Sequence, residues 1–217
     1  MYERVIPQLE TIQTLTAQSQ NRLVCVEAGH IYTDETPNEL HEVGARVGAN
    51  VCTVLENMGI KIQKMLFIDD YNAESHDLNI GDYQELLSKC GFSADKLVME
   101  SSLENDAIQI IDDLEKIFLI EENKNGSLIL KKGHKREKEI VLRKSPSMGA
   151  TPACVALDTA LYLKKYEEAG LCVTILHSIW KDQQKGVQKV LKALGKELPI
   201  LSIFYSEEGE IEVDFDF

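Results

Sequence analysis

Several features that would assign this sequence to a familiar class of protein are missing. No apolar run approaches the ~20 residues that are needed to cross a bilayer. The opening residues, Met1-Tyr2-Glu3-Arg4, lack the basic start and the apolar block of a secretory signal. We therefore expect a cytoplasmic protein that has no membrane partner.

Paired cysteines are also missing. The chain has five cysteines, and none of them forms a Cys-x-x-Cys motif. An odd number without such pairs argues against a disulfide framework and against a zinc site. We expect reduced, buried thiols at all five positions, which are Cys25, Cys52, Cys90, Cys154 and Cys172.

Positive charge is scarce. The chain has 23 Lys and Arg against 36 Asp and Glu, which gives a formal net charge of −13. An acidic surface of this size repels phosphate backbones, so we expect no nucleic acid partner. The exception is the basic segment, residues 131–144, which holds seven of the 23 basic residues.

Two catalytic motifs are absent as well. The chain has no Gly-x-x-x-x-Gly-Lys-Ser/Thr phosphate loop and no Gly-x-Ser-x-Gly nucleophile elbow. These absences remove a P-loop enzyme and a typical serine hydrolase from consideration.

The sequence does contain an alternation of buried strands and amphipathic helices. This order predicts an α/β fold with a mostly parallel, doubly wound, Rossmann-like sheet that has helices on both faces. An Asn-Gly turn between apolar runs predicts an inserted β-hairpin near 117–131. Alternating acids and apolar residues at 210–217 predict an antiparallel C-terminal edge strand, with Ile211, Val213, Phe215 and Phe217 facing the core.

No linker or repeat divides the chain, so we expect a single α/β domain over residues 1–217. Apolar residues at helical spacing predict an N-terminal helical arm over residues 1–20. Residues 117–138 are expected to form a hairpin and basic insertion in this domain.

Two adjacent carboxylates mark the end of one buried strand. Met65-Leu66-Phe67-Ile68 is fully apolar and stops at Asp69 and Asp70. Ligands of parallel sheets bind beyond the carboxyl ends of the strands, and Mg²⁺ is commonly held there by one or two carboxylates with substrate phosphates. We predict a Mg²⁺ site at Asp69 and Asp70; in the alternative, one carboxylate caps a turn and the other is solvated.

Phe67-Ile68-Asp69-Asp70 resembles the late acidic motif of haloacid-dehalogenase-type hydrolases. That family also needs an Asp-x-Asp motif at an earlier strand end, where this chain has Glu27-Ala28-Gly29. The resemblance therefore implies no membership of the family.

A second candidate site is the loop between the basic segment and the next helix. It combines cations and hydroxyls with Thr151, the predicted N-cap of a helix that Pro152 opens, and free N–H groups at such an N-terminus bind anions. The predicted phosphate contacts are Arg143, Lys144, Ser145, Ser147 and Thr151. The alternative is an ordinary capped turn beside a solvated basic strand.

The end of the first strand supplies the candidate catalytic residues. Glu27 and His30 follow the apolar run Leu23–Val26, and either could act as a general acid or base. His30 could equally be a hydrogen-bonded loop residue. His177 lies at a later strand end and is a candidate of second rank.

These sites together suggest an enzyme or nucleotide-handling protein that acts on a phosphorylated small molecule. The expected chemistry is phosphoryl or nucleotidyl transfer or phosphoester hydrolysis, with Mg²⁺ and cations balancing charge on phosphoryl oxygens. The alternative is a non-catalytic α/β module that uses residues 131–144 as a docking surface for an acidic partner. The sequence leaves the oligomeric state open.

Overall fold

The computed structural model describes residues 23–32, 39–69, 80–134, 137–206 and 210–216, together with Glu10 and Thr14. For residues 29–32, Leu40, Asp69, Phe215 and Asp216 the description covers the backbone alone. Most of the predicted N-terminal arm lies outside these residues, although Glu10 and Thr14 are both helical. None of the described helices has the length and apolar composition that a membrane span requires.

The chain divides into two compact units, which we describe separately. Unit 1 comprises Met1–Ser101, Lys165–Lys181 and Leu198–Phe217, and unit 2 comprises Ser102–Lys164 and Asp182–Glu197. The predicted insertion, residues 117–138, forms part of unit 2. That the two units form one domain stays a prediction.

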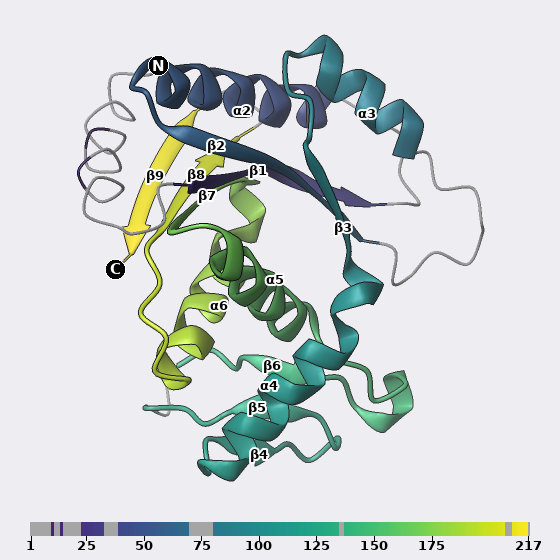
Figure 1. The fold of residues 1–217 in the computed structure, drawn as a ribbon. Coiled ribbons are helices and arrows are strands. Elements are labelled where there is room, and N and C mark those ends of the chain that lie inside the picture. The colour runs from purple at the N-terminus through teal and green to yellow at the C-terminus, as the bar shows by residue number, and fades with distance from the viewer. Residues whose placement is uncertain are drawn as a thin grey trace. The chain divides into compact units, whose positions relative to one another are not determined.

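Unit 1 contains a six-stranded sheet whose order is β3-β2-β1-β7-β8-β9. All neighbouring strands are parallel except β8 and β9. This confirms the predicted mostly parallel, Rossmann-like sheet with an antiparallel C-terminal edge strand (Figure 1). The elements are β1 (Leu23–Tyr32), α2 (Glu39–Asn57), β2 (Lys61–Asp69), α3 (Ile80–Lys89), β3 (Lys96–Met99), β7 (Leu171–His177), β8 (Ile200–Tyr205) and β9 (Ile211–Asp216).

Helices α2 and α3 lie over one face of this sheet (Figure 1). The alternate residues Val24, Val26 and Ala28 of β1 face α2 and are buried with Val47 and Val51 of that helix. Residues of β7 and β8 extend this apolar core, against which Ile211 and Val213 of β9 also pack. The predicted inward orientation is thereby confirmed for the first two apolar residues of the C-terminal strand.

Two glycines allow α2 to approach the sheet closely. A Cβ atom on Gly48 would lie 2.9 Å from the Cβ of Ala28 and 3.1 Å from the Phe92 ring. A Cβ atom on Gly44, one turn earlier, would lie 2.7 Å from the Tyr205 Oη atom. A side chain at either position would therefore push the helix away from the sheet.

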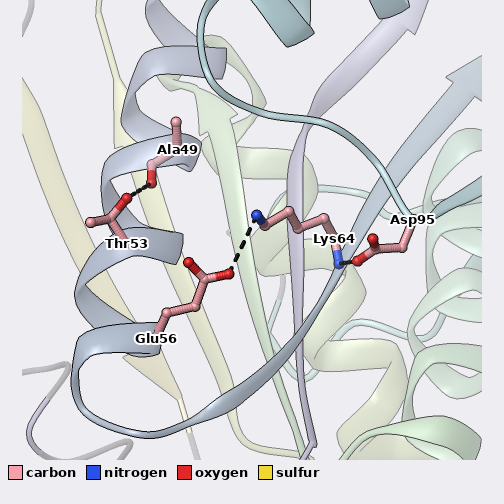
Figure 2. A network of polar contacts seen from close by, with 5 residues as sticks. All are labelled: Ala49, Thr53, Glu56, Lys64 and Asp95. Atoms are coloured by element: carbon pink, nitrogen blue, oxygen red, sulfur yellow. Dashed lines mark hydrogen bonds and ion pairs between the residues drawn. The ribbon is translucent and has the colours of Figure 1, made fainter.

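A polar network fixes the start of β3 against β2 (Figure 2). The Lys64 backbone N–H donates to the Asp95 carboxylate over 2.8 Å, and the Asp95 N–H donates to the Lys64 carbonyl, also over 2.8 Å. The Lys64 Nζ atom lies 3.4 Å from a Glu56 carboxylate oxygen near the end of α2. The Asp95 side chain thus accepts the N–H of Lys64 in the way that a backbone carbonyl of a neighbouring strand would. This hydrogen bond helps to set the β2–β3 register.

The other face of the sheet carries polar side chains. Glu27 and Thr174 are cross-strand neighbours, as are Thr174 and Ser202, and all three are buried. The Lys165 amine of α5 (Cys154–Glu168) forms a buried ion pair with Glu27. This face buries an ion pair and two hydroxyl groups among apolar side chains such as Met65 and Phe204, whereas the core beneath α2 is apolar.

Unit 2 combines helices with a small antiparallel sheet of order β4-β5-β6. The predicted hairpin is confirmed: β4 pairs with β5, and Gly126 takes a φ of +81° in the turn between them. β6 pairs with β5 as a third strand. The elements are α4 (Glu104–Lys116), β4 (Ile120–Glu122), β5 (Leu128–Leu130), β6 (Val141–Arg143), the first part of α5, and α6 (Lys181–Ala193).

Candidate functional site

The strongest candidate site is the carboxyl edge of the six-stranded sheet beside β1 and β7. From β1 the chain proceeds outward through β2 to β3, whereas β7 and β8 extend the sheet on the other side of β1. β1 and β7 are therefore neighbours at the point where the winding direction reverses. Open α/β sheets bind their ligands in the crevice outside the carboxyl ends of such strands.

His177 is the last residue of β7 and stands at this edge. Its Nδ1 atom accepts a hydrogen bond from the Ile179 N–H over 3.5 Å, so the proton of the neutral ring is placed on Nε2. Nε2 is buried and has no hydrogen-bond partner among the residues that the structure describes. Nε2 is one of eight buried side-chain polar atoms without a partner among the described residues, and its N–H is available to an acceptor at the sheet edge.

Tyr205 supports His177 from the neighbouring strand. The two residues are cross-strand partners, and their rings meet edge to face with centroids 5.5 Å apart. Burial raises the pKa of the Tyr205 hydroxyl to about 12, so the phenol stays neutral at physiological pH. The close approach of Gly44 brings the first two turns of α2 against the same ring.

The N-terminal end of α2 contributes a second aromatic pair. The His41 ring meets the ring of Tyr83 on α3 edge to face, with centroids 5.0 Å apart. α2 begins at Glu39, shortly after β1 ends at Tyr32, so its N-terminus and positive dipole end belong to the carboxyl edge. The first turn of α2 also carries the acidic residues Glu39 and Glu42, which offset part of the positive dipole that this terminus offers to an anionic ligand.

The structure corrects the predicted position of Glu27 and His30. β1 does not end near Glu27 but runs on to Tyr32, with a register shift against β2 between Glu27 and His30. Glu27 therefore lies inside the strand, 1% exposed and paired with Lys165, on the face opposite His177 and Tyr205. His30 lies within the strand rather than in a loop, and only its backbone is described.

Asp69 is the last residue of β2, paired in register with Tyr32 of β1, so its backbone lies at the carboxyl edge as predicted. Its side chain and the whole of Asp70 are outside the description. Among the described residues, no group of three or more His, Cys, Asp or Glu side chains is arranged to hold a metal ion. Mg²⁺ binding at Asp69 and Asp70 stays a prediction.

The predicted anion loop belongs to unit 2, and its details differ from the prediction. Thr151 is not an N-cap, because α5 begins at Cys154 and Pro152 instead forms an antiparallel bridge with Arg143. The Lys144 N–H donates to the Thr151 carbonyl over 2.8 Å. The loop is closed as an extension of the small sheet before the helix starts.

Hydrogen bonds within this loop occupy many of its groups. The N–H groups of Met148 and Ala150 both donate to the Ser145 carbonyl, and the Ser145 and Ser147 hydroxyls lie 2.9 Å apart. Fewer N–H groups are therefore left for an anion than the sequence suggested. Phosphate binding by Arg143, Lys144, Ser145, Ser147 and Thr151 stays a prediction.

The basic segment is partly neutralised inside unit 2. Lys132 pairs with Glu139 at 2.9 Å, and Lys138 pairs with Asp182. These ion pairs reduce the net positive charge that residues 131–144 could offer to an acidic partner.

The sequence indicates His177 only as a candidate of second rank. It does not indicate that Tyr205 contacts the His177 ring or that Gly44 lies against Tyr205. A histidine that ends a strand whose other residues are apolar except for Thr174 was a detectable signal. The approach of Gly44 to Tyr205 was not detectable, because the two residues are 161 positions apart in the chain.

No protein-family model matches the sequence, and no curated protein matches it. Solved structures do match the fold. They include a protein assigned as an arginyl-tRNA synthetase from Campylobacter jejuni (13% identity, TM-score 0.64) and the arginyl-tRNA synthetases of Plasmodium falciparum (11%, 0.64) and Thermus thermophilus (12%, 0.63). Each match covers 91% of this chain but only 60%, 49% and 52% of the respective neighbour. At such low identity the likeness shows a shared Rossmann-like fold and nothing finer.

Proposed function

We propose that this protein handles a nucleotide at the carboxyl edge of its six-stranded sheet, in the crevice beside β1 and β7. The observation that carries the proposal is the buried Nε2–H of His177, which has no acceptor among the described residues. A phosphoryl oxygen is a suitable acceptor, since hydrogen bonds to charged oxygens are the stronger kind. The N-terminus of α2 adds its dipole to the same edge.

The structural neighbours support a nucleotide-related role. They are named as enzymes that make arginyl-tRNA, and this chain shares their fold over 91% of its own length. The neighbours' own substrates do not transfer with the fold, because one fold supports many functions.

Within this proposal the described residues have separate tasks. His177 donates through Nε2 to a phosphate, and Tyr205 holds its ring in place by the edge-to-face contact. Asp69 and Asp70 would hold Mg²⁺, which would supply charge balance to the phosphates when bound. Glu27 acts with Lys165 as part of the sheet's support, because its side chain lies on the opposite face.

The test is calorimetric titration of the full chain with ATP, ADP and inorganic phosphate, with and without Mg²⁺. His177→Phe keeps a ring against Tyr205 but removes the donor, and it should weaken ATP binding by about tenfold or more. His177→Gln restores an N–H donor and should recover part of the affinity. His134→Phe, at an exposed position in unit 2, is the matched control and should bind ATP as the parent does.

Two results would refute the proposal. One is that the parent protein binds none of the three ligands. The other is that His177→Phe and His134→Phe bind ATP equally well. Asp70→Asn tests the metal separately: a loss of the Mg²⁺ dependence with unchanged thermal stability supports the metal site, and an unchanged Mg²⁺ dependence refutes it.

A further inference from the structure

Unit 2 contains a cavity that has no part in the nucleotide proposal. Its volume is about 470 Å³, within the range of small-molecule sites. It lies among the segment Lys138–Val141, which leads into β6, the first turn of α5 and the first turns of α6. All the residues that line it belong to unit 2.

The floor of the cavity is apolar. Ile140, Val141, Ala153 and Val155 line it, and Gly186 contributes only backbone from α6. A Cβ atom on Gly186 would meet Val155 at 3.4 Å and Ile140 at 3.8 Å, which are ordinary contact distances. The missing side chain at Gly186 therefore keeps space open above these residues, and a larger residue there would fill it.

Among the residues that the structure describes, the rim of the cavity carries one cation that no carboxylate offsets. Lys138 pairs with Asp182, and Lys189 pairs with Glu137. Glu139, the remaining acid on the rim, pairs with Lys132 at 2.9 Å. Within the described part of the chain, exposed Lys185 is the rim amine that has no ion-pair partner.

The N-terminal turns of two helices open onto the same space. Cys154 begins α5, and Asp182 and Gln183 belong to the first turn of α6. The prediction that all five cysteines are buried is wrong for Cys154, which is exposed, and for Cys90, which is partly exposed. Cys154 is the most exposed of the five cysteines and gives the cavity a reporter group that can be alkylated.

From this arrangement we propose that the cavity binds a small amphipathic organic anion. The apolar body of the ligand lies over Val155 and Gly186, and its carboxylate or similar head group binds the Lys185 amine. The charge of Lys185 favours a ligand with an anionic head group, and the apolar floor favours a ligand with an apolar body. The site is independent of the nucleotide site in unit 1.

The first experiment titrates the full chain with octanoate and, in parallel, with neutral 1-octanol. Octanoate should bind at one site more tightly than 1-octanol and should weaken as salt rises. Lys185→Gln should weaken octanoate by about threefold to fivefold and leave 1-octanol unchanged, as expected for one exposed charge. Lys192→Gln, which alters an exposed lysine of the same helix outside the cavity, should change neither.

The second experiment locates the ligand. Saturating octanoate should slow the reaction of Cys154 with iodoacetamide, and Gly186→Val should abolish the binding of both probes. If Gly186→Val does not fold, alkylation of Cys154 with N-ethylmaleimide should block octanoate instead. The proposal is overturned if octanoate leaves the rate at Cys154 unchanged, or if Lys185→Gln and Lys192→Gln behave alike.

Discussion

The two faces of the six-stranded sheet are built from the same strands, and they differ in that one of them buries an ion pair. Beneath α2, the side chains of Val24, Val26 and Val173 form an apolar surface onto which two glycines bring the helix close. On the other face, Glu27 is buried together with Thr174 and Ser202. Both faces bury apolar side chains, and the face of Glu27 depends in addition on the pairing of a buried charge.

The two faces should therefore be sensitive to different kinds of substitution. An apolar, closely packed face is damaged by added volume, because its atoms have nowhere to move. A face that holds a buried ion pair is damaged when one partner is removed, because the other charge is left in a medium of low polarity. The side chains of the candidate site, His177 and Tyr205, lie on the face beneath α2, since they follow its alternation.

The largest effect is expected from breaking the buried ion pair. Lys165→Met leaves the carboxylate of Glu27 buried without its partner and should lower the free energy of unfolding by about 3–5 kcal/mol. The double variant Lys165→Met/Glu27→Gln should recover most of this loss. Urea unfolding measures both.

The control for this prediction is Lys89→Met, which removes an exposed partner of Glu85 on α3. It should leave the unfolding midpoint close to that of the parent, because exposed ion pairs contribute little. A Lys165→Met protein as stable as Lys89→Met would show that the buried pair has no structural role.

The second largest expected effect is a loss of protein stability at alkaline pH, caused by two titratable groups that are buried beneath α2. Burial raises the pKa of Cys52 from 9.0 to about 12 and the pKa of Tyr205 from 10.0 to about 12. Since both folded-state pKa values are raised, their contribution is fully present below about pH 9 and is lost as pH rises toward 12. In that window each group lowers stability by up to about 1.4 kcal/mol per pH unit.

Unfolding free energies measured from pH 8 to 11 check this prediction. Cys52→Ala and Tyr205→Phe should each show a shallower decline than the parent, whatever their stability at pH 8. Parallel curves for all three proteins would mean that neither group remains protonated because of burial.

A smaller loss is expected from filling the space under α2. Gly48→Ala places a methyl group 2.9 Å from the Ala28 Cβ atom and should cost about 1–3 kcal/mol. Ala28→Gly in the same chain should return part of it, although the Phe92 ring at 3.1 Å still has to shift. Thermal melts of the single and double variants test this prediction. If the effects of the two substitutions on stability simply add, the proposed contact between positions 48 and 28 is contradicted.

The smallest expected effect is a gain in stability rather than a loss. Gly81 lies in α3, and no described atom would lie within 4 Å of its Cβ atom. Gly81→Ala should therefore stabilise the protein by a few tenths of a kcal/mol up to about 1 kcal/mol through helix propensity alone. If it instead destabilises as Gly48→Ala does, the cost at Gly48 is not a packing effect.

Much of the fold was predictable because its signals are local. The apolar run Met65–Ile68 is buried in β2, and the Asn-Gly turn closes the β4–β5 hairpin. The candidate site was less predictable. A bulge extended β1 past Glu27, and the pairing of Pro152 with Arg143 delayed the start of α5 to Cys154.

The sequence by itself determined the α/β class, the hairpin and the edge strand, because hydrophobic periodicity and turn chemistry act over a few residues. Only the tertiary structure decided that Glu27 pairs with Lys165, 138 positions away, and that Gly44 meets Tyr205. Both contacts depend on which strands become neighbours and on how closely helices pack on them. Those distances are set by the packing of the whole sheet, and no short stretch of sequence contains them.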